Sequence, residues 1–464
     1  MGHPDLVVVS NRGPLSFTTG PNGELVTHRG AGGLVSSLGP AVTGTGATWV
    51  AGAITDADRL AEARGLVEAE GFRLRLLAVE PDGYRQFYDV IANATLWFLN
   101  HGLFDLPRRP RIDRRWYQAW DAFRDVNRAF ATAAAAEAPD GATVLVHDYH
   151  LPLVGAELAR TRPDLRTAYF HHTPFCDPSA LRVLPDEVAT ELLSGMAGHG
   201  ACGFHSARWA AAFEACAGAV LGSAPTTFVS PATIDAADLA AVAASPKCAA
   251  ELAALEERIG DCRLIVRVDR IELSKNLLRG FLAFEALLEA EPHLREQVVF
   301  AACVYPSRDA LPEYLAYRTE METLVERLNN RWSTPSWTPI LLDTSDSYPR
   351  SVAALRRYDV LLVNPLRDGL NLVALEGPAV NDCDGVLILS REAGAWDGLG
   401  DGALGINPFD VAGTAAALSR ALAMEPVERA ERAASTRTAS QRRSPQDWLD
   451  DQLAAAKGSA ADRS

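Results

Sequence analysis

The segment NPLRDGLNLVALEG, residues 364–377, combines residue types that could bind a phosphate and two sugars. It continues the apolar run DVLLV and turns into a helical pattern, so Asp368 is expected at a strand-to-helix turn. The next four backbone amides would stand at a helix N-terminus, which binds anions well. These four residues are Gly369, Leu370, Asn371 and Leu372. Asp368 and Glu376 supply carboxylates that can accept hydrogen bonds from sugar hydroxyls.

A second segment, RVDRIELSKN at residues 267–276, places two cations just after a predicted strand. Arg270 and Lys275 lie five residues apart, and two cations aimed at one point suit a diphosphate leaving group. A solvated helix start is the alternative interpretation. The chain has 44 basic residues, and its only lysines are Lys247, Lys275 and Lys457. This rarity of lysine favours a specific role for Lys275.

Polar residues also follow predicted strands in the first half of the chain. The motif HRGAGGLVSSL contains Gly33 before a helical pattern, where the backbone could approach a phosphate closely. The motifs VHDYH and FHHTPF put Asp148 and His172 at strand ends. Taken singly, such a glycine turn is more often only a turn, and such a histidine is as often structural.

Alternating apolar runs and helical patterns indicate the elements that position these motifs. Runs at residues 5–10, 143–148 and 166–172 are typical of buried parallel strands. The second half repeats the pattern at residues 263–269, 297–304, 338–343, 359–365 and 385–390. The sequence therefore predicts an α/β protein with two doubly wound parallel sheets, which bind ligands at the carboxyl ends of their strands.

The join between the two predicted domains falls near FVSPATIDAADL, residues 228–239. We expect one domain at residues 1–232 and a second at residues 233–440. Residues 441–464 form a helix carrying Trp448, followed by a frayed end, and we expect this helix to pack back on the first domain.

Composition limits the classes of partner. The net charge of −15 disfavours nucleic acid and anionic membranes, and no apolar run has the length of a membrane span. The first apolar run has only four residues, too few for a signal peptide, so a cytoplasmic protein is expected. The seven cysteines are scattered without a C-x-x-C pair, which indicates neither a metal site nor disulfides.

Taken in order, the motifs resemble those of the trehalose-6-phosphate synthases, retaining glycosyltransferases of family 20. The resemblance runs through SNR, GGL, TLW, HDYH, HTPF, GFH, R-x-x-x-S-K, RDGLNLVA-x-E, NPFD and the terminal tryptophan helix, and so covers nearly the whole chain. It implies the GT-B fold, in which two Rossmann-like domains face each other across a cleft. The first would bind a sugar-phosphate acceptor and the second a nucleotide-sugar donor.

The resemblance implies a role for each matching residue. Arg270, Lys275 and Gly33 would hold the donor diphosphate, together with backbone amides of residues 369–372. Asp368 and His172 would bind the donor glucose, and Glu376 the ribose. The acceptor, glucose 6-phosphate, would be held by residues of both domains. These residues are Arg12, Tyr88, Trp97, Asp148 and Arg308.

The implied reaction is transfer of glucose from a nucleotide diphosphate glucose to glucose 6-phosphate, giving α,α-trehalose 6-phosphate. The sequence offers no carboxylate nucleophile of the kind that retaining hydrolases use. The resemblance instead implies front-side displacement without metal or cofactor, in which the leaving phosphate helps to deprotonate the acceptor. The sequence does not identify the nucleotide base, and both a monomer and a homo-oligomer fit it.

Two departures from the family pattern keep other functions open. The family has a second tryptophan soon after Trp49, where this chain has small residues, and its lysine before the ribose glutamate is Leu375 here. The alternatives are a pseudo-glycosyltransferase that couples a cyclitol nucleotide to an amino-cyclitol phosphate, and a glucosylglycerol-phosphate synthase. A catalytically silent nucleotide-sugar-binding regulator is the third, and the retained donor motifs argue against it.

Overall fold

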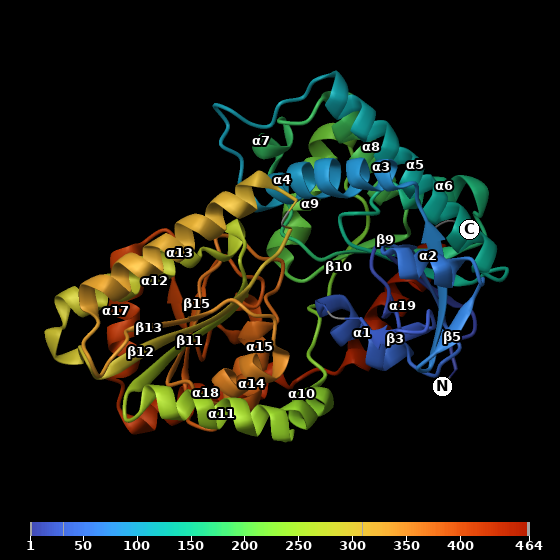
Figure 1. The fold of residues 1–464 in the computed structure, drawn as a ribbon. Helices are drawn as coiled ribbons and strands as arrows, with labels where there is room; N and C mark the ends of the chain where they lie inside the picture. The colour runs from blue at the N-terminus through green and yellow to red at the C-terminus, as the bar shows by residue number, and fades with distance from the viewer. Residues whose placement is uncertain (1, 31, 309, 462–464) are drawn as a thin grey trace. The chain divides into compact units, whose positions relative to one another are not determined.

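The computed structural model describes residues 2–30, 32–308 and 310–461, which form two compact α/β units (Figure 1). Unit 1 contains the chain up to Ala232 and the segment from Pro445 onward, and unit 2 contains Thr233–Ser444. Each unit has its own sheet of largely parallel strands. The predicted class of two doubly wound parallel sheets is therefore confirmed.

The main sheet of unit 1 has eight strands in the order β10-β9-β8-β7-β1-β4-β6-β5. All neighbours are parallel except β5 and β6, which are antiparallel. Its strands are β1 (Leu6–Ser10), β4 (Thr48–Ala53), β5 (Val67–Ala69), β6 (Phe72–Ala78), β7 (Thr143–His147), β8 (Arg166–His171), β9 (Ala201–Phe204) and β10 (Thr227–Val229). A separate antiparallel hairpin joins β2 (Leu15–Thr19) to β3 (Leu25–Arg29).

The helices of unit 1 come from most of the first half of the chain and from its C-terminal segment. They are α1 (Gly33–Val42), α2 (Asp56–Glu62), α3 (Pro81–Arg85), α4 (Phe98–His101), α5 (Arg114–Glu137), α6 (Val154–Thr161), α7 (Pro178–Leu181), α8 (Asp186–Ala197), α9 (Ala207–Leu221) and α19 (Pro445–Ala461). Residues Gln86–Trp97 form a π-helix, η1, a rare form that is frequent at functional sites.

The C-terminal helix α19 packs against α1 and β8 of unit 1. Its Trp448 is fully buried and donates a hydrogen bond from Nε1 to the carbonyl oxygen of Ser230 at 3.2 Å. Asp451 accepts a hydrogen bond from the Ser230 hydroxyl at 2.7 Å. Helix α19 is thus hydrogen-bonded to the residue that directly follows β10.

The sheet of unit 2 has six parallel strands in the order β13-β12-β11-β14-β15-β16. They are β11 (Arg263–Arg270), β12 (Val298–Tyr305), β13 (Ile340–Asp343), β14 (Val360–Val363), β15 (Val386–Ser390) and β16 (Leu404–Ile406). Strands β14 and β15 are completely buried, as expected for parallel strands covered on both faces.

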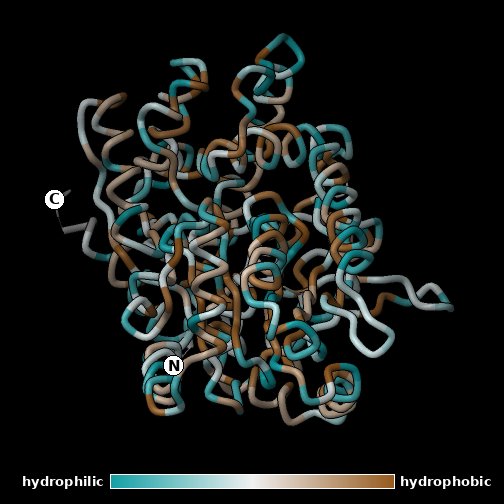
Figure 2. The backbone as a smooth tube through the Cα atoms, turned by 90° about the vertical axis from the view of Figure 1, so that its left-hand side faces the viewer, coloured by the Kyte–Doolittle hydropathy of each residue, from teal (hydrophilic) through white to brown (hydrophobic). Residues whose placement is uncertain are grey.

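Helices cover both faces of this sheet, with α12, α13 and α17 on one side and α11 and α14 on the other (Figure 1). The α-helices of unit 2 are α10 (Ala236–Ala243), α11 (Pro246–Ile259), α12 (Leu277–Ala290), α13 (Pro312–Trp332), α14 (Tyr348–Arg357), α15 (Val373–Val380), α16 (Trp396–Leu399), α17 (Val411–Leu422) and α18 (Pro426–Ser440). Two short 3₁₀ turns lie at Leu273–Lys275 and Pro292–Leu294. Hydrophobic residues concentrate in the inner segments of the chain, and the outer loops are mostly hydrophilic (Figure 2).

Candidate active site

In unit 1, three of the predicted site residues follow neighbouring strands. Strand β7 pairs in parallel with β1 on one side and with β8 on the other, so their carboxyl ends lie at one edge of the sheet. Arg12 follows β1, Asp148 follows β7 and His172 follows β8. The structure brings these residues to the edge at which open α/β sheets bind ligands. The side chain of Arg12 is exposed there.

Tyr88 lies in a column of stacked rings beside this edge. Its ring stacks on Tyr84 and on His150 with centroid distances of 5.6 Å and interplanar angles of 13° and 6°. The Tyr84 hydroxyl lies 3.1 Å from the side-chain nitrogen of Asn11, the neighbour of Arg12. Burial raises the pKa of Tyr84, so its phenol stays neutral. The column therefore fixes the position of the partly buried Tyr88 ring.

Asp148 is fixed at the end of β7 by an unusual backbone conformation. Its φ is 75°, in the left-handed region, and a side-chain oxygen accepts the Tyr149 amide at 2.9 Å. The other oxygen lies 3.7 Å from Nδ1 of His150. Because a quarter of the side chain is exposed, at 25%, the carboxylate is held in place yet accessible to a hydroxyl group.

His172 belongs to a cluster of histidines against helix α19. Its Nε2 lies 3.1 Å from Nδ1 of His147, and the Trp448 ring packs on both imidazoles at centroid distances of 5.7 and 5.9 Å. Burial, reinforced by His205, lowers the pKa of His147 to about 3 and that of His172 well below its usual value. Both imidazoles are therefore neutral near pH 7, and His172 suits a hydrogen bond to a neutral hydroxyl.

Trp97 and Gly33 occupy less open positions. The Trp97 ring is 7% exposed and packs at 4.0 Å on His101 and at 5.4 Å on Tyr149, measured between ring centroids. Most of this predicted acceptor residue is therefore inside unit 1. Gly33 begins helix α1, after Gly32, whose φ of 131° requires glycine.

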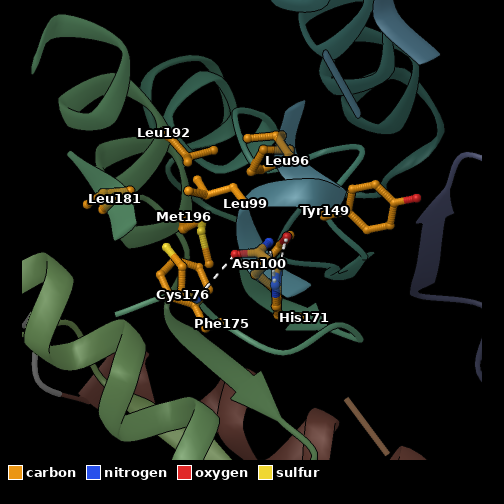
Figure 3. A pocket seen from close by; sticks show the side chains of 12 residues that line it. Leu96, Leu99, Asn100, Tyr149, His171, Phe175, Cys176, Leu181, Leu192 and Met196 are labelled. Carbon is orange, nitrogen blue, oxygen red and sulfur yellow. Dashed lines mark hydrogen bonds between the residues drawn. The ribbon is translucent and has the colours of Figure 1, made fainter. Parts of the chain in front are cut away.

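A small cavity in unit 1 lies next to these residues, but its lining does not suit a sugar phosphate (Figure 3). Its walls are mostly apolar, with side chains such as Leu96, Leu99 and Met196. Burial lowers the pKa of its histidine, His171, to about 3, so that side chain carries no charge near pH 7. A phosphate would find no cation among the residues that line this cavity.

Unit 2 gathers a second set of predicted residues at one sheet edge. Strand β11 pairs in parallel with β12 and with β14. Arg270 ends β11, Arg308 follows β12 and Asp368 follows β14. Each of the two arginines lies within ion-pair distance of Glu272, which is completely buried.

Lys275 and Asp368 form an ion pair within this edge. The lysine Nζ lies 2.5 Å from Oδ2 of Asp368, and the side-chain amide of Asn371 donates to the same oxygen at 3.1 Å. Burial alone would lower the pKa of Lys275, but Asp368 and Asp269 outweigh it and raise that pKa. Lys275, the predicted diphosphate cation, and Asp368, the predicted sugar carboxylate, therefore fix each other's position.

A buried arginine positions the backbone around Lys275. Arg267 is completely buried and donates to the carbonyl oxygen of Lys275 at 3.0 Å, to Asp269 at 2.9 Å and to the Asn364 side chain at 3.1 Å. It thereby joins the turn after β11 to the segment after β14. Sequence reasoning missed this role, because an arginine inside an apolar run gives no signal of its partners.

The loop that carries Asp368 is held by a glycine-containing segment after β15. The Asp368 amide donates to the Glu392 carbonyl and the Gly394 amide donates to the Asp368 carbonyl, both at 3.1 Å. A Cβ atom at Gly394 would overlap the carbonyl oxygen of Gly369. Glycine is therefore required at position 394, which the sequence analysis did not single out.

The expectation that residues 369–372 form a helix N-terminus needs correction. Helix α15 begins at Val373, with Leu372 as its N-cap, so these four residues form the loop that leads into the helix. Asn371 delays the helix because its φ is 82° and its side chain accepts the Ala374 amide at 3.2 Å. The amides of residues 369–372 therefore belong to the loop that follows Asp368.

Glu376 lies in the first turn of α15, partly buried. Burial raises its pKa to about 7, although a hydrogen bond with the Tyr348 hydroxyl lowers it. Its neighbour Leu375, where the family has a lysine, packs against an apolar cluster that includes Ile234 and Val352. The leucine at this position therefore serves the core of unit 2.

The absence of a second tryptophan after Trp49 also has a structural reason. Trp49 is 1% exposed in strand β4, and its Nε1 donates to the Ser10 hydroxyl at 2.8 Å. The following residues are buried in the same strand, and a Cβ atom at Gly52 would lie 3.1 Å from the Asn11 carbonyl oxygen. A large side chain there would displace the end of β1.

Other features of the described residues bear on ligand classes. All seven cysteines are free thiols. Within residues 2–30, 32–308 and 310–461, no three His, Cys, Asp or Glu side chains are grouped to hold a metal ion. No helix in the same part of the chain is both long and apolar enough to cross a membrane.

Comparison with known proteins gives a consistent result. Residues 4–457 match the model of glycosyltransferase family 20. The chain is 34% identical over 455 residues to the bifunctional trehalose-6-phosphate synthase/phosphatase of Thermoproteus tenax. That match covers 92% of this chain and 60% of the relative, so the chain spans less than two thirds of that protein.

Solved structures match nearly the whole length of the chain. The E. coli trehalose-6-phosphate protein bound with UDP-2-fluoro glucose has a TM-score of 0.84 at 30% identity, covering 97% of this chain and 98% of its own. The alpha,alpha-trehalose-phosphate synthase (UDP-forming) of Burkholderia xenovorans, in complex with glucose-6-phosphate, has a TM-score of 0.84 at 28% identity. This second match covers 97% and 100% of the two chains. The predicted GT-B fold is confirmed by these similarities.

Proposed function

Since the chain belongs to glycosyltransferase family 20, we propose that it transfers glucose from UDP-glucose to glucose 6-phosphate and forms α,α-trehalose 6-phosphate. One observation carries this proposal most strongly: Arg270, Lys275 and Asp368 meet at one edge of the unit 2 sheet. Such a set suits a nucleotide sugar, because it offers two cations for a diphosphate and a carboxylate for a sugar. The UDP-sugar analogue in the E. coli relative favours uridine as the base.

The donor diphosphate is bound by Arg270, Lys275 and the loop amides of residues 369–372, with Gly33 approaching it. Positive groups there stabilise the charge that develops on the departing UDP, which is the main task of the protein in such a reaction. Glu376 accepts hydrogen bonds from the ribose hydroxyls. Its partly buried position favours this role, because a desolvated carboxylate gains more from each hydrogen bond.

The donor glucose is held by Asp368 and His172. The short bond from Lys275 orients the Asp368 carboxylate, and Asn371 supports the same oxygen. His172, neutral near pH 7, bonds to the hydroxyl at the 6-position of the sugar. The sugar is thus aligned by hydrogen bonds instead of being attacked by a side chain.

The acceptor is held through its phosphate and its ring. Arg12 and Arg308 bind the phosphate, Tyr88 and Trp97 contribute to the acceptor site, and Asp148 bonds to a hydroxyl near the reacting carbon. Guanidinium groups suit a phosphate because their planar fork matches its oxygens. The glucose-6-phosphate complex of the Burkholderia xenovorans relative supports this choice of acceptor.

The reaction proceeds with retention by front-side displacement. The bond from the anomeric carbon to the diphosphate breaks, the acceptor oxygen bonds to the same face, and its proton passes to the leaving phosphate. The chain's own contribution is alignment of two sugars and stabilisation of the diphosphate charge. The seven free thiols suit a reducing, cytoplasmic compartment.

One observation favours a second candidate, a pseudo-glycosyltransferase acting on a cyclitol nucleotide and an amino-cyclitol phosphate. Strand β4 has no aromatic residue after Trp49, so one wall of the family's glucose acceptor site is absent.

A turnover screen tests the proposed donor and acceptor. UDP-, GDP- and ADP-glucose are each supplied with glucose 6-phosphate, with glycerol 3-phosphate as the alternative acceptor, and release of nucleoside diphosphate is measured. UDP release that depends on glucose 6-phosphate supports the proposal. Turnover with glycerol 3-phosphate alone would instead assign a glucosylglycerol-phosphate synthase.

A further inference from the structure

We propose that Glu272 is a positioning residue that couples the two phosphate sites, because one oxygen of its carboxylate holds both Arg270 and Arg308. This inference rests on the proposed function, in which Arg270 binds the donor diphosphate and Arg308 the acceptor phosphate. Glu272 itself touches neither substrate. It acts by fixing two guanidinium groups at the spacing that two neighbouring phosphates require.

The carboxylate of Glu272 is rigidly placed. The residue is 0% exposed, and Oε1 accepts the Ser274 hydroxyl at 2.6 Å. Oε2 lies 2.7 Å from a terminal nitrogen of Arg308 and 3.3 Å from one of Arg270. Since Ser274 fixes one oxygen, the other presents a single point to which both arginines are drawn.

Arg308 is more tightly held than a surface arginine. Its side chain is 7% exposed, its backbone φ is 52°, and the same terminal nitrogen donates to the Tyr314 hydroxyl at 3.0 Å. Its guanidinium carbon lies 5.4 Å from the centroid of the Tyr314 ring. A guanidinium has five N–H donors, so it can hold a carboxylate and a phosphate together.

Two guanidinium groups placed this close repel each other. Burial lowers the pKa of Arg270 and the charge of Arg308 lowers it further, but Glu272, with smaller contributions from Tyr305 and Tyr314, raises the pKa on balance. A single carboxylate therefore permits two cations to occupy one edge of the sheet. Without it they would separate, and neither would keep its place relative to a phosphate.

Neutralising Glu272 has two opposing physical effects, which makes the proposal falsifiable. Removing a negative charge strengthens the local positive field, which alone would tighten binding of both anions. Loss of positioning weakens binding of both, because each guanidinium must then be ordered anew. We expect positioning to dominate, since charge-assisted hydrogen bonds to a buried carboxylate are strong and directional.

The test uses Glu272→Gln in the full chain, with Glu285→Gln as a matched control. Glu285 is also a largely buried carboxylate that bridges two arginines, Arg327 at 3.0 Å and Arg331 at 2.7 Å, on helices α12 and α13. Calorimetry gives the Kd of UDP alone and of glucose 6-phosphate in the presence of UDP. Kinetics give kcat and both KM values.

Glu272→Gln should lower the affinity for UDP and the affinity for glucose 6-phosphate, each by about tenfold. Glu285→Gln should change neither affinity. When Glu272→Gln is added to Arg308→Ala, the affinity for UDP should still fall. The affinity for glucose 6-phosphate should stay at the value of Arg308→Ala alone. Tighter binding of either ligand, an effect on one ligand only, or behaviour equal to Glu285→Gln would overturn the proposal. Failure of the unmutated chain to bind or turn over these ligands would overturn the proposed function, and the inference with it.

A second variant covers the case in which Glu272→Gln does not fold. Ser274→Ala removes the hydroxyl that fixes Oε1 and leaves the charge in place. Ser274→Ala should lower the affinity for both ligands by about threefold, which corresponds to the lower range of the net free energy of a hydrogen bond. Unchanged affinity for both ligands in a folded Ser274→Ala variant would contradict the positioning role.

Discussion

The ammonium group of Lys275 lies 2.5 Å from a carboxylate oxygen of Asp368, although the two residues are 93 positions apart in the chain. They leave adjacent parallel strands, β11 and β14, which is why they meet. The pair joins a diphosphate cation to a sugar-binding carboxylate in the proposed reaction. In this proposal, the two members of one ion pair bind the phosphate and the sugar of the same donor.

The first prediction concerns the diphosphate cations. Lys275→Ala and Arg270→Ala should each lower turnover by ~10²–10³-fold, as loss of a transition-state donor does elsewhere. The control is Lys247→Ala, which changes an exposed lysine at the start of helix α11. Steady-state kinetics on folded variants provide the measurement. Rates of Lys275→Ala or Arg270→Ala close to those of Lys247→Ala would remove these residues from the site.

A second prediction separates the two substrates. Arg308→Ala should raise the KM for glucose 6-phosphate by tenfold or more, roughly the effect of losing a charge-assisted hydrogen bond. Because Arg270 remains, the Kd of UDP should stay within about threefold of normal. Calorimetry with UDP and kinetics with varied acceptor test both statements. An equal loss of UDP affinity would assign Arg308 to the donor instead.

The third prediction is a pH dependence of nucleotide binding. Burial raises the pKa of Glu376 to about 7, so the residue is protonated below that pH and ionised above it. The carboxylate accepts hydrogen bonds from ribose hydroxyls more strongly than the protonated acid, which loses its charge and part of its acceptor capacity. The affinity for UDP should therefore fall as pH is lowered through about 7 and level off above it.

The phosphate of UDP itself gains a proton near pH ~6, so the control is Glu376→Gln, which keeps that contribution and removes the carboxylate. Calorimetry from pH 5 to 9, about the range of interest around neutrality, gives the two profiles. Identical pH profiles for the two proteins would exclude Glu376 as the titrating group.

The fourth prediction tests the loop that carries Asp368. Gly394→Ala should displace Gly369 and lower turnover by ~10²-fold, the scale expected for a misplaced catalytic group. Gly398→Ala is the matched control, since a Cβ atom there meets open space. Activity of Gly394→Ala equal to that of Gly398→Ala would show that this contact does not set the geometry of Asp368.

The fold was predictable because the strands carry a strong local signal. The runs at residues 263–269 and 359–365 became β11 and β14 with boundaries shifted by few residues. Continuous burial on both faces makes parallel strands uniformly apolar, and this pattern survives without knowledge of the partners. The antiparallel hairpin of β2 and β3 was not anticipated, since its strands are half exposed and polar.

The candidate site was predictable only in part. Motif spacing pointed to Arg270, Lys275 and Asp368, because each follows an apolar run. It could not reveal that Lys275 and Asp368 bond to each other, or that Glu272 joins two arginines, because such contacts depend on strand order. The start of helix α15 was also misjudged, since the left-handed conformation of Asn371 and its side-chain bonds to Asp368 and Ala374 depend on the folded loop.

The most direct test of the central claim is the reaction itself. Purified protein supplied with UDP-glucose and glucose 6-phosphate should release UDP and form a non-reducing disaccharide phosphate, identified by mass spectrometry and by NMR of the two anomeric protons. The account predicts α configuration at both anomeric carbons. Absence of product from any of the three nucleotide glucoses, together with turnover of a cyclitol nucleotide and an amino-cyclitol phosphate, would contradict it.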